Sequence, residues 1–135
     1  MGKNHLEEYE RYRDIFRGER LPLAFVDLEK FDRNVAFVAS TQGQTGKTIR
    51  VHSKSIRCVA LLRRILETGG DAFQGVMTFT MEETAFLAEK GFDDFIVSYP
   101  TVQPTDLDLF AGLTRGGKTV SLIVDSEDHL ERLSR

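Results

Sequence analysis

Three side chains able to carry positive charge occupy alternate positions in a short β-type run, residues 49–54 (IRVHSK). Successive side chains of a strand point to opposite faces, so Arg50, His52 and Lys54 are expected to share one face. Cations stacked in this way repel one another and are costly to remove from water. The run therefore predicts an anionic partner for this face.

Lys54 is the residue of this run best suited to chemistry, because it stands where the strand is expected to end. A lysine that is partly desolvated and close to other cations has a lowered pKa, and its neutral amine is a nucleophile. Schiff-base chemistry with an aldehyde requires such an amine. A solvated surface lysine is the alternative, and the residues alone favour neither.

The elements that would position these residues alternate regularly between strand and helix. Hydrophobic patterning predicts strands at 21–28, 49–55, 73–79, 94–100 and 119–126, and helices at 5–17, 29–43, 56–70, 80–91, 105–113 and 127–135. Thr80 and Glu83 have the spacing of a capping box at the start of one of these helices. Such alternation implies parallel strands joined by right-handed helical crossovers.

An open doubly wound sheet and a (β/α)8 barrel both fit this alternation. A complete barrel takes about 250 residues, so a chain of 135 residues would supply only its first half. The expected fold class is α/β, with successive β-α units over residues 21–135 forming the first half of a TIM-type barrel after an amphipathic helix in residues 1–20. Because no terminal strand closes the sheet, we expect a piece of a longer protein that self-associates, with a homodimer as the expected state.

Composition and charge exclude several classes of function. The 18 Lys and Arg are mixed along the chain with 21 Asp and Glu, which gives a net charge of −3 and argues against binding to nucleic acid or an anionic membrane. A single cysteine excludes an internal disulfide framework and indicates a cytoplasmic location. The charged start is unlike a secretory signal, and no apolar run approaches the roughly 18 residues of a membrane span.

Three further features have simpler interpretations than the sites they suggest. Residues 43–48 (GQTGKT) end like a phosphate-binding loop, but they lack its glycine spacing and lead from a helix into a strand. Asp125 and His129 are four residues apart and could share a metal, although two ligands alone are a weak signal and no metal site is expected in this chain. Cys58 is expected to be a packed core thiol.

Two segments resemble the opening of the barrel-type pyridoxal-phosphate enzymes. They are 21–35 (LPLAFVDLEKFDRNV) and 49–55 (IRVHSKS), and the resemblance, which extends over about residues 20–125, is greatest to the D-threonine aldolase and D-serine dehydratase group, with the alanine racemases more distant. In that group a strand ending in Asp-Leu precedes a helix with Arg-Asn, and the next strand carries Arg-Pro-His-x-Lys-Thr. Here Val51 replaces the proline of that motif, and Ser55-Ile56-Arg57 replaces its usual Thr-His-Lys.

The resemblance implies that Lys54 binds pyridoxal 5′-phosphate as a Schiff base, with Arg50, His52, Thr78 and Tyr99 around the cofactor. It also implies a lyase or isomerase that acts on a small amino acid, D-configured or β-hydroxylated, by aldol cleavage, dehydration or racemisation. Any divalent metal would bind outside this segment, in a C-terminal domain. A module that binds pyridoxal phosphate or a partner without catalysis is the alternative.

Overall fold

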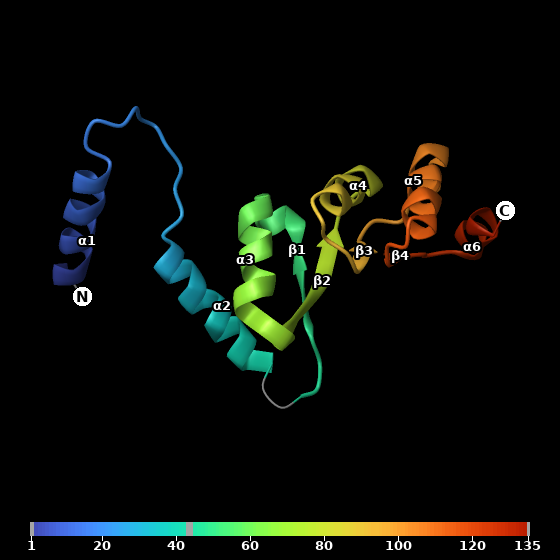
Figure 1. The fold of residues 1–135 in the computed structure, drawn as a ribbon, viewed down its shortest axis with the longest axis horizontal. Coiled ribbons are helices and arrows are strands. Elements are labelled where there is room, and N and C mark those ends of the chain that lie inside the picture. Colours follow the sequence, from blue (N-terminus) through green and yellow to red (C-terminus); the bar gives the residue numbers. More distant parts are fainter. Residues whose placement is uncertain (1, 43–44, 135) are drawn as a thin grey trace.

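Four short parallel strands and the helices that follow them form the fold, which the computed structural model describes for residues 2–42 and 45–134. In chain order the elements are α1 (Gly2–Ile15), α2 (Leu28–Gln42), β1 (Ile49–His52), the 3-10 turn η1 (Ser53–Ser55), α3 (Val59–Gly69), the 3-10 turn η2 (Gly70–Ala72), β2 (Phe73–Thr78), α4 (Met81–Glu89), β3 (Phe95–Val97), α5 (Pro104–Arg115), β4 (Val120–Leu122) and α6 (Glu127–Leu133). Figure 1 shows α1 at one end of the molecule and α6 at the other.

The sheet distinguishes between the two architectures that the sequence allows. Its strands are all parallel and lie in the order β1-β2-β3-β4, so each strand pairs with the next one in the chain. Helices α3, α4 and α5 follow one another along one side of this sheet (Figure 1). A doubly wound sheet would reverse its strand order and carry helices on both faces. The arrangement therefore confirms the expected α/β fold and has the form of a partial barrel.

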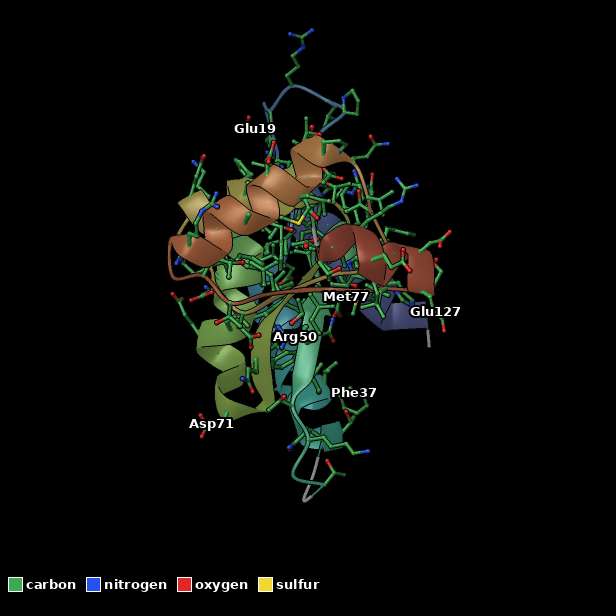
Figure 2. The ribbon with its side chains drawn as sticks, turned by 90° about the vertical axis from the view of Figure 1, so that its right-hand side faces the viewer. Glu19, Phe37, Arg50, Asp71, Met77 and Glu127 are labelled. Atoms are coloured by element: carbon green, nitrogen blue, oxygen red, sulfur yellow. The ribbon has the colours of Figure 1, made fainter. Side chains whose placement is uncertain are left out.

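Side-chain alternation separates the two faces of the sheet. The helix-facing side is apolar and forms the core, in which Val76 and Phe95 of the strands pack with Leu62 of α3 and Leu87 of α4. Val51 of β1 packs against the same cluster. The opposite face, which we call the open face, therefore carries the intervening residues of the strands: Arg50, His52, Met77, Ile96, Ser121 and, just beyond β3, Ser98. Figure 2 shows the labelled Arg50 and Met77 over the strands at the centre of the view.

The predicted strand at 21–28 is wrong. Residues 23–27 belong to no helix or strand, and the side chains of Phe25 and Val26 are 48% exposed. The ring of Phe25 lies 4.9 Å from that of Tyr12 and 4.6 Å from that of Phe16, both from the amino-terminal helical region. Phe25 thus packs on α1 and the turn that follows it, and the segment does not pair with β1.

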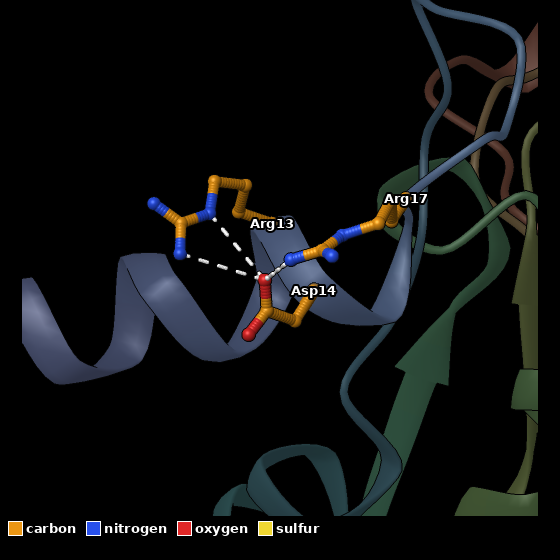
Figure 3. A network of polar contacts seen from close by, with 3 residues as sticks. All are labelled: Arg13, Asp14 and Arg17. Atoms are coloured by element: carbon orange, nitrogen blue, oxygen red, sulfur yellow. Dashed lines mark hydrogen bonds and ion pairs between the residues drawn. The ribbon is translucent and has the colours of Figure 1, made fainter.

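The end of α1 and the turn that follows it carry a small network of exposed charges (Figure 3). One carboxylate oxygen of Asp14 accepts hydrogen bonds from Arg17 at 2.7 Å and from Arg13 at 3.4 Å. Ion pairs between solvated side chains such as these contribute about 0–1 kcal/mol to stability. Among the described residues, none of the helices has both the length and the apolar character needed to cross a membrane.

Candidate active site

Lys54 lies at the carboxyl end of the sheet, immediately after β1. The predicted strand 49–55 is too long, because β1 ends at His52 and the backbone then forms the turn η1, on which Lys54 is the middle residue. Strand alternation therefore places Arg50 and His52 on one face but does not apply to Lys54. Both Lys54 and its neighbour Ser55 are exposed, so the expected partial burial of the lysine is not seen in this chain.

Tyr99 is the side chain that meets the Lys54 amine. The Tyr99 hydroxyl lies 3.5 Å from Lys54 Nζ, and the centre of the Tyr99 ring lies 5.6 Å from the same atom. The second distance is that of a cation–π contact, which contributes about 0.5–1 kcal/mol at an exposed site. The structure thus brings together two of the predicted site residues, from the loops that follow β1 and β3.

His52 holds the backbone of Lys54 by accepting a hydrogen bond. Its Nδ1 atom lies 3.3 Å from the backbone nitrogen of Lys54, which donates, and it caps the turn η1. Burial lowers the pKa of His52 from its ordinary value, the charge of Lys54 lowers it further, and the charge of Glu83 opposes both. A lowered pKa favours the neutral imidazole, and only an unprotonated Nδ1 can accept this hydrogen bond.

Ser98 adds an unused polar group near the same end of the sheet. Its backbone N–H donates to the carbonyl of Thr78 at 2.8 Å, and alternation from Val97 places its side chain on the open face. The Ser98 hydroxyl oxygen is buried and has no hydrogen-bond partner within the described residues. A buried hydroxyl in this state is costly unless another group supplies the missing bond. The sequence marked Ser98 only as part of a strand tip.

Arg50 was expected beside the cofactor, but in the structure its side chain binds Asp94. Its guanidinium donates to the Asp94 carboxylate at 2.9 Å and to the Asp94 backbone carbonyl. Asp94 directly precedes β3, so this contact lies at the amino end of the sheet, away from the turn that carries Lys54. The anionic partner that the charge pattern predicted is therefore present, but for Arg50, and it comes from the chain itself.

Thr78 is likewise not available to a ligand. It is fully buried, and its hydroxyl lies 2.6 Å from the hydroxyl of Thr84 on α4. Thr78 shares the helix-facing side of β2 with Val76, two residues before it, since side chains two positions apart in a strand point the same way. The predicted contact between Thr78 and the cofactor gains no support from this position, although Thr78 does end a strand as expected.

The remaining candidates do not form a site. His129 is buried, and its Nε2 lies 2.7 Å from the carbonyl of Thr101, whereas its Nδ1 lies 3.4 Å from Asp125. The described part of the chain contains no group of three potential metal ligands. Cys58 is exposed and precedes α3 in an extended conformation, so its prediction as a core thiol is wrong. Within the segment 43–48, residues 43 and 44 lie outside the described residues.

Comparisons with known proteins point to one kind of enzyme. No protein-family model matches the chain. A 3-hydroxy-D-aspartate aldolase from Paracoccus denitrificans is 26% identical over 113 residues, which are 84% of this chain and 29% of that protein. The crystal structure of D-threonine aldolase from Filomicrobium marinum matches 85% of this chain and 30% of its own, with a TM-score of 0.76 and 25% identity.

The chain thus spans about three tenths of the length of the relatives it matches. Its sequence is weakly homologous to one aldolase of a D-amino acid, and its fold matches that of another. The comparison of sequences and the comparison of structures therefore point to the same kind of enzyme. They confirm the resemblance to the D-threonine aldolase group for an N-terminal portion of such an enzyme.

Proposed function

We propose that this chain carries the cofactor lysine of a pyridoxal-phosphate-dependent lyase, and that the protein it represents cleaves a small β-hydroxy D-amino acid by an aldolase reaction. The observation that carries the proposal is the place of Lys54. Its amine lies at the carboxyl end of a parallel sheet, beside Tyr99, in a fold that matches D-threonine aldolase. In β-α barrels the carboxyl ends of the strands form the active site.

The groups at this end of the sheet fit one end of such a cofactor. Lys54 offers an exposed amine to an aldehyde, and the buried hydroxyl of Ser98 lacks a partner among the described residues. Tyr99 is 55% exposed and offers an aromatic face beside the amine. Pyridoxal phosphate, when bound, supplies an electron sink that stabilises charge at the substrate Cα.

Each residue would then have a distinct task. Lys54 would hold the cofactor covalently through Nζ, and Tyr99 would orient that amine chiefly through its ring. His52 would fix the backbone of Lys54 and remain neutral, because burial and the charge of Lys54 lower its pKa. Dehydration or racemisation of the same amino acid would use the same attachment, and the names of the relatives favour aldol cleavage.

The exposure of this end of the sheet favours a second candidate for the chain taken by itself. Lys54 and Tyr99 are both exposed, whereas catalysis at a reactive centre depends on the exclusion of water. The second candidate is a module that binds pyridoxal phosphate through Lys54 without turnover. The two candidates share the same lysine and differ only in whether a substrate is consumed.

An absorbance titration of the chain with pyridoxal phosphate tests the proposal. A band at roughly 410–430 nm is expected for the wild type and for Lys90→Ala, and no such band is expected for Lys54→Ala. Lys90 is a matched control, because its amine lies 5.2 Å from the ring centre of Phe86, much as Lys54 lies over Tyr99. A band that persists in Lys54→Ala at full height would overturn the assignment.

A turnover assay separates the two candidates. The chain is incubated with pyridoxal phosphate and either D-threonine or 3-hydroxy-D-aspartate, with and without a divalent metal, and release of the aldehyde is followed. Aldehyde release that depends on Lys54 would support the aldolase. A Lys54-dependent band without aldehyde release would support the binding module for this chain.

A further inference from the structure

Glu83 lies against the turn that carries Lys54, and its contacts are not those of an ordinary helix cap. In a capping box the glutamate three residues after the N-cap returns to the backbone N–H of the N-cap itself. Here Thr80 makes the usual N-cap contact, because its hydroxyl accepts a hydrogen bond from the backbone N–H of Glu83 at 3.2 Å. The Glu83 carboxylate instead accepts the backbone N–H of Phe79, one residue earlier, at 3.0 Å.

The same carboxylate oxygen of Glu83 also reaches η1. The Ser53 hydroxyl donates to Glu83 Oε2 at 2.8 Å, although the two residues are 30 positions apart, and the carbonyl of Met77 lies farther from the same hydroxyl, at 3.2 Å. Ser53 is 1% exposed, whereas the next two residues of the turn, Lys54 and Ser55, are exposed. Ser53 is therefore the residue that anchors the turn, and Glu83 is the charged group that holds Ser53. Hydrogen bonds to an ionised acceptor are about twice as strong as neutral ones.

The backbone of the turn depends on the same anchor. The carbonyl of Ser53 accepts the N–H groups of Ile56 at 3.0 Å and of Arg57 at 2.8 Å, which closes the turn around Lys54. A displacement of the Ser53 backbone would therefore move the carbonyl that accepts these two N–H groups. One oxygen of Glu83 thus links the end of β2, the start of α4 and the turn after β1.

We propose that Glu83 is a positioning residue for Lys54: its carboxylate holds η1 through Ser53 so that the Lys54 amine stays beside Tyr99. The proposal deepens the proposed function and rests on it wherever cofactor binding is measured. It assigns to Glu83 a role beyond capping α4, and it predicts that loss of the carboxylate oxygen alters Lys54 more than loss of the cap does.

The test compares labelling at Lys54 with labelling at Lys90 in the same sample, by adding pyridoxal phosphate, reducing with borohydride and mapping the peptides. Glu83→Ala is expected to lower the ratio of Lys54 to Lys90 labelling about tenfold, since a displaced amine loses its positioned contacts. Glu83→Gln keeps an oxygen that can accept both hydrogen bonds, and its ratio is expected within about twofold of the wild type.

Two further variants separate positioning from general damage to α4. Thr80→Ala removes the other half of the cap and leaves the contact between Glu83 and Ser53, so its ratio is expected to stay within about twofold. Ser53→Ala removes the contact and is expected to lower the ratio as Glu83→Ala does, with no additional loss in the double variant. An unchanged ratio in Glu83→Ala, or an equal loss in Thr80→Ala, would overturn the proposal.

Amide hydrogen exchange tests the same link without the cofactor. The amides of Ile56 and Arg57 are expected to exchange about tenfold faster in Glu83→Ala than in the wild type, and to be unaffected in Thr80→Ala. If the wild type shows no preference for Lys54 but these amides respond as expected, the proposed function fails and the Glu83 link stands. If the amides do not respond, the Glu83 link fails whatever the labelling shows.

Discussion

The two ends of the same sheet use their polar residues in opposite ways. At the amino end, the Arg50 guanidinium is held by the carboxylate and backbone carbonyl of Asp94, and both side chains are largely covered. At the carboxyl end, the Lys54 amine and the Tyr99 ring are exposed, and Ser98 has a hydroxyl without a partner in the described chain. At the amino end the two charged side chains pair with each other, although Asp94 Oδ2 is also buried without a partner among the described residues, whereas at the carboxyl end the exposed amine of Lys54 remains open to a ligand, as in β-α barrels generally.

A glycine makes the closed arrangement at the amino end possible. The register between β1 and β2 shifts by one residue opposite Arg50, and Gly75 adopts a positive φ of 64° in this bulge. A Cβ atom at this position would collide with the guanidinium of Arg50 and with the backbone carbonyl of Asp94. The bulge, the arginine and the aspartate therefore form one unit, and we expect substitutions there to lower stability without changing the chemistry of Lys54.

Among the substitutions that test the difference between the two ends, Gly75→Ala should lower stability most. Positive φ and a clash with backbone act together, so we expect the free energy of unfolding to fall by about 3–4 kcal/mol. The control is Gly91→Ala, where φ is also positive at 88° but a Cβ would meet nothing within 4 Å, and about 1–2 kcal/mol is expected. Urea unfolding measures both, and equal losses would show that Gly75 does not serve the Arg50 contact.

Arg50→Leu should have the next largest effect. It leaves the half-buried Asp94 carboxylate without its cation, and about 2 kcal/mol of stability should be lost. Arg17→Ala, in the exposed network of Figure 3, removes an ion pair of similar length and should cost less than about 0.5 kcal/mol. Labelling of Lys54 by pyridoxal phosphate should be the same in both variants. A loss of labelling in Arg50→Leu would indicate that Arg50 contributes to cofactor binding.

Tyr99 should have a moderate effect, confined to the carboxyl end. Tyr99→Phe keeps the ring beside the Lys54 amine and should change the labelling of Lys54 by less than about twofold, whereas Tyr99→Ala should lower it about three- to fivefold. Because Tyr99 is exposed, the free energy of unfolding should change by less than about 0.5 kcal/mol in Tyr99→Phe. A large loss of labelling in Tyr99→Phe would show that the hydroxyl, and not the ring, positions the Lys54 amine.

The smallest expected effect is on the titration of His52. Its pKa is lowered from the ordinary value of 6.5, chiefly by burial and then by Lys54, so the unfolded chain binds the proton more readily than the folded one. The His52 contribution to stability is therefore full above pH 6.5 and is lost as the pH falls through this value toward the lowered pKa. Histidine NMR titration should show a higher pKa in Lys54→Ala and a lower one in Glu83→Gln, and shifts of the opposite sign would contradict the assigned contacts.

The sequence was sufficient to predict the β-α alternation, because the periods of strands and helices differ and each parallel strand needs a crossover. It failed at residues 21–28, where an apolar extended segment looks the same whether it pairs in a sheet or packs on a helix. Cys58 shows a related limit. It stands four residues before Leu62 and thus at helical spacing, but α3 begins at Val59, and an extended Cys58 leaves the apolar face.

The sequence predicted those site residues that belong to local motifs, but not the contacts between residues far apart in the chain. Lys54 and Tyr99 stood out as strand-tip residues, and the structure brings them together. The carboxylate partner of Arg50 lies 44 residues away, and the carboxylate partner of Ser53 lies 30 residues away, so no local pattern identifies them. Glu83 could have been noticed through its capping-box spacing with Thr80, but only the fold shows that its side chain turns toward Ser53.

Reductive mapping of the intact chain is the first measurement to make, because it identifies the lysine that holds pyridoxal phosphate. The chain is mixed with the cofactor, reduced with borohydride and digested, and the modification at every lysine is quantified. We expect Lys54 to carry most of the label, at least about tenfold more than Lys90, because its amine is positioned beside Tyr99 at the carboxyl end of the sheet. Label spread evenly over the exposed lysines would contradict this expectation.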